Sequence, residues 1–282
     1  MTRPVAMITG ASRGIGAESA VALAREGFDV AITARTLEAG EAYDHAGTVG
    51  AYPGSLAATA KQIEALGGRA LCLQADILDE ARSIGAVQQV LKEFGQLDLL
   101  LNNATFQGIG NMVPLADLER GHLEATFQSN VFTPLAMIRE ALPAMQARGT
   151  GTVINMLSAT AYSDPPAPPD AGGWGFAYAA AKAAMGRLAG CLRAEYPEAG
   201  LRFFNLEPGT VITELMKRAG MADAILKYAD PCSAAAIAGV VAWLSRNEPE
   251  AGWLADGALH APVIAKALFL LDAPSLLEDV DG

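Results

Sequence analysis

Tyr178 and Lys182 are the two residues whose types and spacing point most directly to chemistry. They lie at the start of an amphipathic segment, and in a helix a spacing of four places both side chains on one face. A phenol with a pKa of about 10 is a poor acid or base at neutral pH, but a nearby ammonium stabilises the phenolate and lowers that pKa. The pair is therefore a candidate for proton transfer. A solvated helix face is the alternative, because this spacing often occurs by chance.

A glycine-rich turn near the N-terminus is the second chemical feature. Thr9–Gly16 reads TGASRGIG and lies between a short apolar run and a segment of helical period. Glycines allow a tight turn and a close approach of the backbone to a pyrophosphate, whose charge meets the free N–H groups at the start of the helix. An ordinary glycine loop is the alternative. The residues expected to surround a dinucleotide phosphate are Gly10, Ser12, Arg13, Gly14, Ile15 and Gly16.

The second predicted strand should end near Ala34, and the residue that follows bears on which dinucleotide binds. NAD-binding proteins place an acid there, which hydrogen-bonds the ribose 2′-hydroxyl, whereas this chain has Arg35. Arg13 and Arg35 together would converge on the adenosine ribose and pair with a 2′-phosphate. We therefore expect NADP(H) in preference to NAD(H). Two solvated arginines are the alternative, and the long segment after Arg35 leaves NAD(H) open.

The hydrophobic pattern predicts the scaffold that positions these residues. Short apolar runs alternate with segments of helical period, which predicts parallel strands joined by right-handed helical crossovers. The expected strands are Val5–Ile8, Asp29–Thr33, Ala70–Leu73, Leu97–Leu101, Thr152–Met156 and Leu201–Leu206, with a last one near Gly252–Leu254. The expected helices are Ile15–Glu26, Leu56–Leu66, Glu80–Phe94, Leu118–Arg148, Phe176–Tyr196 and Ser233–Trp243. The predicted fold is α/β: a Rossmann-like, doubly wound parallel sheet in a three-layer α/β/α sandwich.

Composition sets limits on partners and location. The chain has 282 residues, of which 51% are hydrophobic, and no polar linker divides it, so a single domain over residues 1–282 is expected. A net charge of −11 argues against nucleic acid and against an acidic membrane surface as partners. The longest apolar run, Ala234–Leu244, is shorter than the ~20 residues that span a bilayer.

Cysteine and histidine usage points to a reduced, cytoplasmic setting without a metal. The cysteines lie far apart and form no disulfide framework or zinc motif, and the histidines lack ligand spacing. They are Cys72, Cys191 and Cys232, and His45, His122 and His260.

Two stretches interrupt the alternation and are expected to be insertions. Residues 36–54 lack a clear period, although βα connections usually have about 2 to 6 residues. Within 159–175, the run Ser163–Gly175 holds four prolines and three glycines, so it forms neither a helix nor a central strand. Both are candidate borders of the active site, and surface insertions are the alternative. Residues 261–282 form a C-terminal tail.

From about Pro4 to Gly257 the sequence resembles the short-chain dehydrogenase/reductase family. The resemblance rests on the TGxxxGxG spacing and on Tyr178 and Lys182, which follow the fifth strand and a serine. It implies an NAD(P)-dependent oxidoreductase that interconverts a ketone or aldehyde and an alcohol by hydride transfer, with Tyr178 as general acid or base. An NAD-linked, hydroxysteroid-like alcohol dehydrogenase is the runner-up. A catalytically idle NADP-binding regulator is the alternative from another class.

The resemblance also implies roles for further residues. Asn155–Ser158 resembles the family's NxSS, which makes Ser158 the hydroxyl that binds the substrate oxygen, and Asn130 matches the asparagine that holds a relay water. The implied tetrad is Asn130, Ser158, Tyr178 and Lys182, in which Lys182 also holds the nicotinamide ribose. For Asn130 the alternative is that it only satisfies a buried carbonyl.

Three more matches concern the cofactor. Asp76 and Ile77 follow the third strand, where the family holds adenine, and a helix-capping aspartate is the alternative. Asn102–Ala104 resembles the family's NNAG, with Thr105 in place of the final glycine, so Asn103 and Ala104 would border the ribose. Pro208–Thr213 resembles the PG motif. Its residues expected at the nicotinamide are Pro208, Gly209, Val211 and Thr213.

The sequence signals for the residues around the substrate are less specific than those for the cofactor. Twenty positions separate Ser158 from Tyr178, more than is usual in the family, so the Pro/Gly insertion is expected to form a wall or lid with Trp174 and Phe176. Glu214–Tyr228 would be a mobile substrate-binding helix pair with an apolar lining, or a core-facing stripe. The lining residues are Met216, Met221, Ile225 and Leu226. The expected partners are an apolar small-molecule carbonyl or alcohol and further copies of the chain in a homodimer or homotetramer, with Ala261–Leu271 at the interface.

Overall fold

A computed structural model describes the fold of most of the chain. The described residues are 2–45, 48–106, 108, 110–197, 200–212, 220, 223, 226–228, 231–250, 253–255 and 257–277. They form an eight-stranded sheet with the order β5-β2-β1-β6-β7-β8-β10-β9, in which neighbouring strands pair in parallel except β10 and β9. The strands are β1 (Val5–Thr9), β2 (Asp29–Ala34), β5 (Ala70–Gln74), β6 (Leu99–Asn102), β7 (Gly151–Met156), β8 (Leu201–Glu207), β9 (Leu254–Ala255) and β10 (Ala258–His260).

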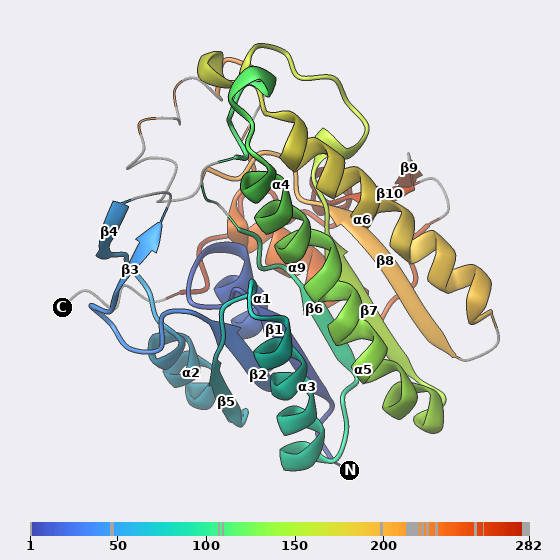
Figure 1. Cartoon of the computed structure of the whole chain (residues 1–282). Helices are drawn as coiled ribbons and strands as arrows, with labels where there is room; N and C mark the ends of the chain where they lie inside the picture. The colour runs from blue at the N-terminus through green and yellow to red at the C-terminus, as the bar shows by residue number, and fades with distance from the viewer. Residues whose placement is uncertain are drawn as a thin grey trace.

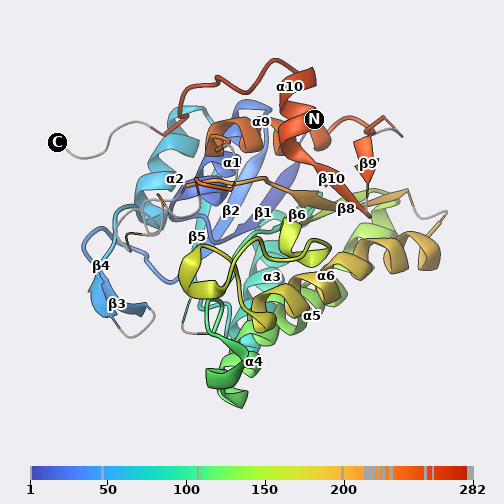
Figure 2. The same ribbon diagram turned by 90° about the horizontal axis from the view of Figure 1, so that it is seen from above.

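Helices cover both faces of this sheet, as Figures 1 and 2 show. One face carries α1 (Gly14–Arg25), α2 (Leu56–Ala65), α9 (Ala234–Leu244) and α10 (Ala261–Ala267). The other carries α3 (Glu80–Phe94), α4 (Arg120–Phe127), α5 (Thr133–Arg148) and α6 (Phe176–Glu195). The predicted single-domain, three-layer α/β/α fold is confirmed. None of the described helices has the length and apolar character needed to cross a bilayer.

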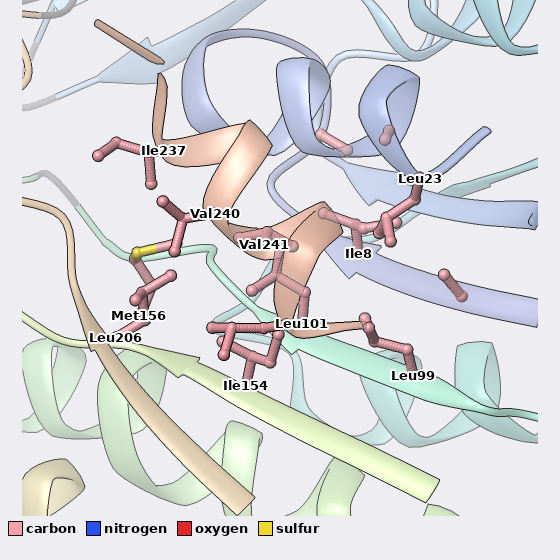
Figure 3. Packing of buried hydrophobic residues seen from close by; sticks show 14 of the residues in the cluster. Ile8, Leu23, Leu99, Leu101, Ile154, Met156, Leu206, Ile237, Val240 and Val241 are labelled. Carbon is pink, nitrogen blue, oxygen red and sulfur yellow. The ribbon is translucent and has the colours of Figure 1, made fainter. Parts of the chain in front are cut away.

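The two cores follow from the alternation of side chains along each strand. In β1, Ala6 and Ile8 belong to the core beneath α1 and α9, whereas Val5 and Met7 belong to the core beneath α3 and α5. Figure 3 shows the first core, where Ile237, Val240 and Val241 of α9 pack onto side chains from the central strands. Because both faces are covered, the strands read as continuous apolar runs in the sequence.

The structure differs from the sequence-based prediction in three places. The single helix expected over Leu118–Arg148 is divided, since a π-helical turn at Gln128–Phe132 separates α4 from α5. The segment 36–54 contains an antiparallel hairpin of β3 (Ala42–His45) and β4 (Thr48–Ala51), which lies outside the main sheet (Figure 1). Instead of one strand near Gly252–Leu254, the chain forms β9 and the three-residue β10, which is too short to give a period of its own.

Candidate active site

The predicted functional residues gather at one edge of the sheet. Because the central strands are parallel, their carboxyl ends face the same side, where ligands bind in open α/β folds. The residues that directly follow β1, β2, β6, β7 and β8 are Gly10, Arg35, Asn103, Leu157 with Ser158, and Pro208. Residues far apart in the sequence thus meet around one site.

The turn after β1 has the geometry of a phosphate cradle. Gly10 has a φ of 71° and Gly14 a φ of 56°, in the left-handed region that favours glycine. A Cβ on Gly16 would lie 2.3 Å from the carbonyl oxygen of Gly10, so only glycine lets α1 approach the strand this closely. Helix α1 begins after Arg13 without a side-chain cap and with no acid in its first turn. Its first N–H groups therefore fit an anion such as a pyrophosphate.

Asn103 locks the glycine-rich turn to the loop after β6. Its amide donates hydrogen bonds to the carbonyl oxygens of Thr9, at 2.9 Å, and Gly10, at 3.3 Å. In the other direction, the backbone N–H groups of Asn103 and Ala104 each donate to the Thr9 hydroxyl at 3.0 Å. These bonds fix the two loops as one unit, so Asn103 has a structural role whatever else it contacts.

Arg35 lines a pocket at the expected adenosine end of the site. The lining residues are Arg35, Gln74, Ala75, Asp76, Asp79 and Arg82. The carboxylate of Asp76 accepts a hydrogen bond from Leu78 N at 3.0 Å, which closes a turn. Asp79, not Asp76, caps α3. Ile77 packs against the core beneath α3 and α5.

Arg13 is held by the insertion that follows β2. Its Nε donates to the Pro53 carbonyl at 2.7 Å, and its Nη2 donates to the Thr36 hydroxyl at 3.1 Å. Because Thr36 is the neighbour of Arg35, this contact brings the Arg13 guanidinium to the end of β2. The close of the insertion also packs on the turn, since a Cβ on Gly54 would lie 2.3 Å from the Ser12 carbonyl oxygen.

Ser158, Tyr178 and Lys182 come together at the ends of β7 and α6. The Ser158 side chain interacts with the Tyr178 phenol and acts to lower its pKa. Lys182, buried one turn further along α6, places its Nζ 5.7 Å from the centre of the Tyr178 ring and donates to the Met156 carbonyl at 2.8 Å. Ser158 is held in turn at the start of a 3₁₀ turn, where it accepts a hydrogen bond from Thr160 N.

The ionisation of this group differs from the sequence-based prediction. Burial raises the pKa of Tyr178, the Ser158 hydrogen bond acts against this rise, and the charge of Glu207 adds to it. Burial lowers the pKa of Lys182 to about 8. The net direction for Tyr178 is thus opposite to the lowering that the Tyr-Lys spacing predicts, because desolvation of the phenol prevails. A phenol is already protonated at neutral pH at its usual pKa of about 10, and this rise does not change that state.

Asn130 lies in the π-helical turn between α4 and α5. Its side-chain amide donates to the Thr126 carbonyl at 2.9 Å, while its Oδ1 accepts a hydrogen bond of 2.9 Å from the Thr105 hydroxyl. Thr105, which stands where the resemblance has glycine, therefore joins the loop after β6 to Asn130. π-Helical turns are frequent at functional sites because they reorient a side chain within a helix.

A row of buried asparagines crosses the sheet just before the strand ends. Asn102 donates to Asn155 at 2.9 Å, and Asn155 donates to Asn205 at 3.3 Å. The three residues are in register across β6, β7 and β8. This row was missed by the sequence analysis, although each asparagine near the end of an apolar strand was a visible signal. It ties together the strands that carry Asn103, Ser158 and Glu207.

The Pro208–Gly209 turn follows β8. Gly209 has a φ of 69°, and its N–H donates to the carboxylate of Glu207 at 2.7 Å. Glu207 was also missed by the sequence analysis, although an acid directly before Pro-Gly at the end of a buried strand was a visible signal. Val211 packs against the core, and Thr213 lies outside the described residues.

The two segments expected around the substrate are described to different extents. In the Pro/Gly insertion, Gly175 N donates to the Asn111 carbonyl at 2.8 Å, which joins the insertion to the loop after β6. Trp174 is half-buried and Phe176 is 57% exposed at the start of α6. Of the expected lining of Glu214–Tyr228, Met216, Met221 and Ile225 lie outside the described residues. Leu226 is described, and it is exposed.

Comparisons with known proteins agree with this geometry. The family model described as short chain dehydrogenase matches residues 4–223. An uncharacterized oxidoreductase of Methylorubrum extorquens is 30% identical over 265 residues, which are 91% of this chain and 95% of that protein.

Two solved structures are also similar to this chain. A metagenomic short-chain oxidoreductase in complex with NADP has 28% identity and a TM-score of 0.67, covering 88% of this chain and 92% of its own. The 3-oxoacyl-[acyl-carrier protein] reductase from Brucella melitensis in complex with NAD has 25% identity and a TM-score of 0.72, covering 93% of this chain and 96% of its own.

Proposed function

This chain belongs to the short-chain dehydrogenase/reductase family of NAD(P)-dependent oxidoreductases, and from that premise we propose that it interconverts a ketone or aldehyde and an alcohol with NADP(H). The observation that carries the proposal is the group at the ends of β7 and α6. There the Ser158 side chain interacts with the Tyr178 phenol, and Lys182 lies one turn further along the same helix. A protein that only sensed the cofactor would not require this group.

Tyr178 is the proton donor in the reducing direction. When bound, the nicotinamide supplies a hydride from its C4 atom to the carbonyl carbon. Tyr178 gives its hydroxyl proton to the carbonyl oxygen, which completes the alcohol and leaves a phenolate. The phenol is protonated at neutral pH before the reaction because its usual pKa is about 10, and burial raises that pKa further. In the oxidising direction the phenolate takes the same proton back.

The neighbours of Tyr178 orient the substrate and stabilise charge. The Ser158 hydroxyl donates a hydrogen bond to the carbonyl oxygen and stabilises its developing negative charge. The Lys182 ammonium favours the phenolate that forms as the proton leaves. Asn130 holds a water molecule that links Lys182 to solvent and so returns a proton to the site. As in the family that the chain resembles, Lys182 also binds the nicotinamide ribose.

Two arginines support NADP(H) as the preferred cofactor. Arg35 follows β2 and lines the pocket at the adenosine end, and Arg13 is held against Thr36 beside it. Guanidinium groups bind a 2′-phosphate through paired, charge-assisted hydrogen bonds. Asp76 and Ile77 would border the adenine, and Ala104, Pro208, Gly209, Val211 and Thr213 would border the ribose and nicotinamide.

One observation favours NAD(H) as a second candidate cofactor. Glu41, at the beginning of the insertion, accepts a hydrogen bond of 2.7 Å from Leu37 N. It also accepts one of 3.4 Å from the Gln74 side chain, which in turn donates to the Arg35 carbonyl at 2.8 Å. A carboxylate near the end of β2 favours a ribose 2′-hydroxyl and repels a 2′-phosphate. Measured affinities for NADPH and NADH distinguish the two candidates.

We also propose an apolar substrate and an oligomeric state. Trp174 and Phe176 offer apolar contacts at the mouth of the site, with the insertion as a wall or lid. The tail after α10 returns to α1, where Leu276 N donates to Glu18 at 2.7 Å. Val263 of α10, and Phe269 and Leu271 after it, remain exposed, as an interface in a homodimer or homotetramer requires.

A carbonyl panel tests the proposed function. The purified protein would be mixed with NADPH or NADH and with ketones, aldehydes and quinones, and cofactor oxidation would be followed by absorbance. Mass spectrometry of small molecules retained through purification would identify the cofactor independently. We expect NADPH-dependent reduction of at least one apolar carbonyl. Tight NADPH binding without turnover on any member of the panel would instead favour the idle regulatory protein.

A further inference from the structure

The buried Glu207 pairs with the partly exposed His260 beside the proposed catalytic group, and the proposed mechanism uses neither residue. They lie at the ends of neighbouring parallel strands, where His260 of β10 is in register with Glu207 of β8. The His260 Nδ1 and a Glu207 carboxylate oxygen are 3.4 Å apart. Glu207 is only 5% exposed. A buried carboxylate is costly unless it is paired and hydrogen-bonded, so the fold retains it at some expense.

The contacts of Glu207 connect it to the turn expected at the nicotinamide. One carboxylate oxygen accepts the Gly209 N–H at 2.7 Å, and the other faces His260. The C-terminal segment closes on the same turn from another side, since a Cβ on Gly209 would lie 2.6 Å from Cγ of Pro262. The turn is therefore held between Glu207, His260 and Pro262.

The segment that leads into Ser158 lies beside the same strand end. Leu157 N donates to the Leu206 carbonyl at 2.8 Å, and this continues the register in which Met156 pairs with Leu206, so Leu157 lies opposite Glu207. The charge of Glu207 disfavours ionisation of Tyr178, the reverse of the effect expected from an ammonium. Among the described residues, the titratable groups around Glu207 are His260 from β10, Cys232 before α9, and Tyr178 from α6.

We propose that Glu207, supported by His260, is a positioning residue that anchors the Pro208–Gly209 turn at the nicotinamide. This inference rests on the proposed function, because it takes that turn to border the nicotinamide. Two substitutions separate the hydrogen bond from the charge. Glu207→Gln keeps an oxygen acceptor for Gly209 N–H but removes the charge, whereas Glu207→Ala removes both.

The anchoring effect is tested by cofactor affinity. We expect Glu207→Ala to weaken NADPH binding roughly five- to tenfold, because the Gly209 N–H loses its acceptor, and Glu207→Gln to stay close to wild type. If Glu207→Ala does not fold, His260→Asn provides the test, with a smaller loss expected because one support of the carboxylate remains. An NADPH dissociation constant equal to wild type in the folded variant would overturn the anchoring effect. Glu195→Gln, exposed at the far end of α6, is the matched control and should bind NADPH as wild type does. This measurement needs no turnover, so its outcome is independent of the carbonyl panel.

Discussion

The ammonium of Lys182 donates a hydrogen bond of 2.8 Å to the main-chain carbonyl of Met156, the last residue of β7. This bond fixes α6 to the strand that leads into Ser158, and it directs the buried amine between the strand end and the Tyr178 ring. The position of the phenol relative to Ser158 therefore depends on a contact that a Tyr-Lys spacing alone does not reveal.

The buried amine gives the reaction a pH dependence. Burial lowers the pKa of Lys182 to about 8, so the ammonium is present below that pH and is lost as the pH rises through it. Because the ammonium stabilises the phenolate formed during reduction, kcat for reduction should fall as the pH rises above about 8. Lys182→Met should have a low kcat without this decrease. A wild-type pH profile that stays flat through this range would contradict the prediction.

Arg35 should control the choice of cofactor. Arg35→Ala removes a guanidinium from the adenosine pocket, so we expect NADPH affinity to fall about tenfold or more, since a charge-assisted hydrogen bond contributes about 1.5–3 kcal/mol. NADH affinity should change little, because it has no 2′-phosphate. Fluorescence titration with both cofactors measures this. Arg25→Ala, at the far end of α1, is the control. If Arg35→Ala lowers the affinities for NADPH and NADH equally, this result would argue against a 2′-phosphate site.

Thr105 should support Asn130 through its hydroxyl. Thr105→Val removes the 2.9 Å hydrogen bond to Asn130 at nearly constant volume, so we expect a loss of about 1 kcal/mol in unfolding free energy and a several-fold lower kcat. Thr105→Ser keeps the hydroxyl and should restore both. Denaturant unfolding and steady-state kinetics provide the measurements. If Thr105→Val and Thr105→Ser have the same unfolding free energy and the same kcat, the hydrogen bond has no part in the site.

Much of the fold could be predicted because local signals agree with the long-range packing. Helix α3 spans Glu80–Phe94 as predicted, since the Asp79 side chain caps its start and Gly95, with a φ of 74°, ends it. The π-helical turn could not be predicted, because the apolar pattern continues from α4 into α5. The pair of Glu207 and His260 depends on β10 lying beside β8, and three residues are too few for a hydrophobic period.

The Pro/Gly insertion should act on the substrate rather than on the cofactor. Deleting residues 165–170 removes its outer part while leaving Gly175, whose N–H anchors the start of α6 to Asn111. We expect KM for the carbonyl substrate to change several-fold, while NADPH affinity stays the same. Steady-state kinetics on several substrates, with NADPH titration alongside, provides the comparison. An unchanged KM for all of them would mean that the insertion is only a surface loop.

Tyr178→Phe tests the central claim most directly, because it removes one oxygen and leaves the ring in place. NADPH affinity would be measured by fluorescence, and carbonyl reduction would be measured with the best substrate of the panel. We predict unchanged NADPH affinity and a loss of turnover of about 10²- to 10⁴-fold, the range typical of a missing general acid. A variant that binds NADPH normally and still reduces the carbonyl at close to the wild-type rate would contradict proton donation by Tyr178.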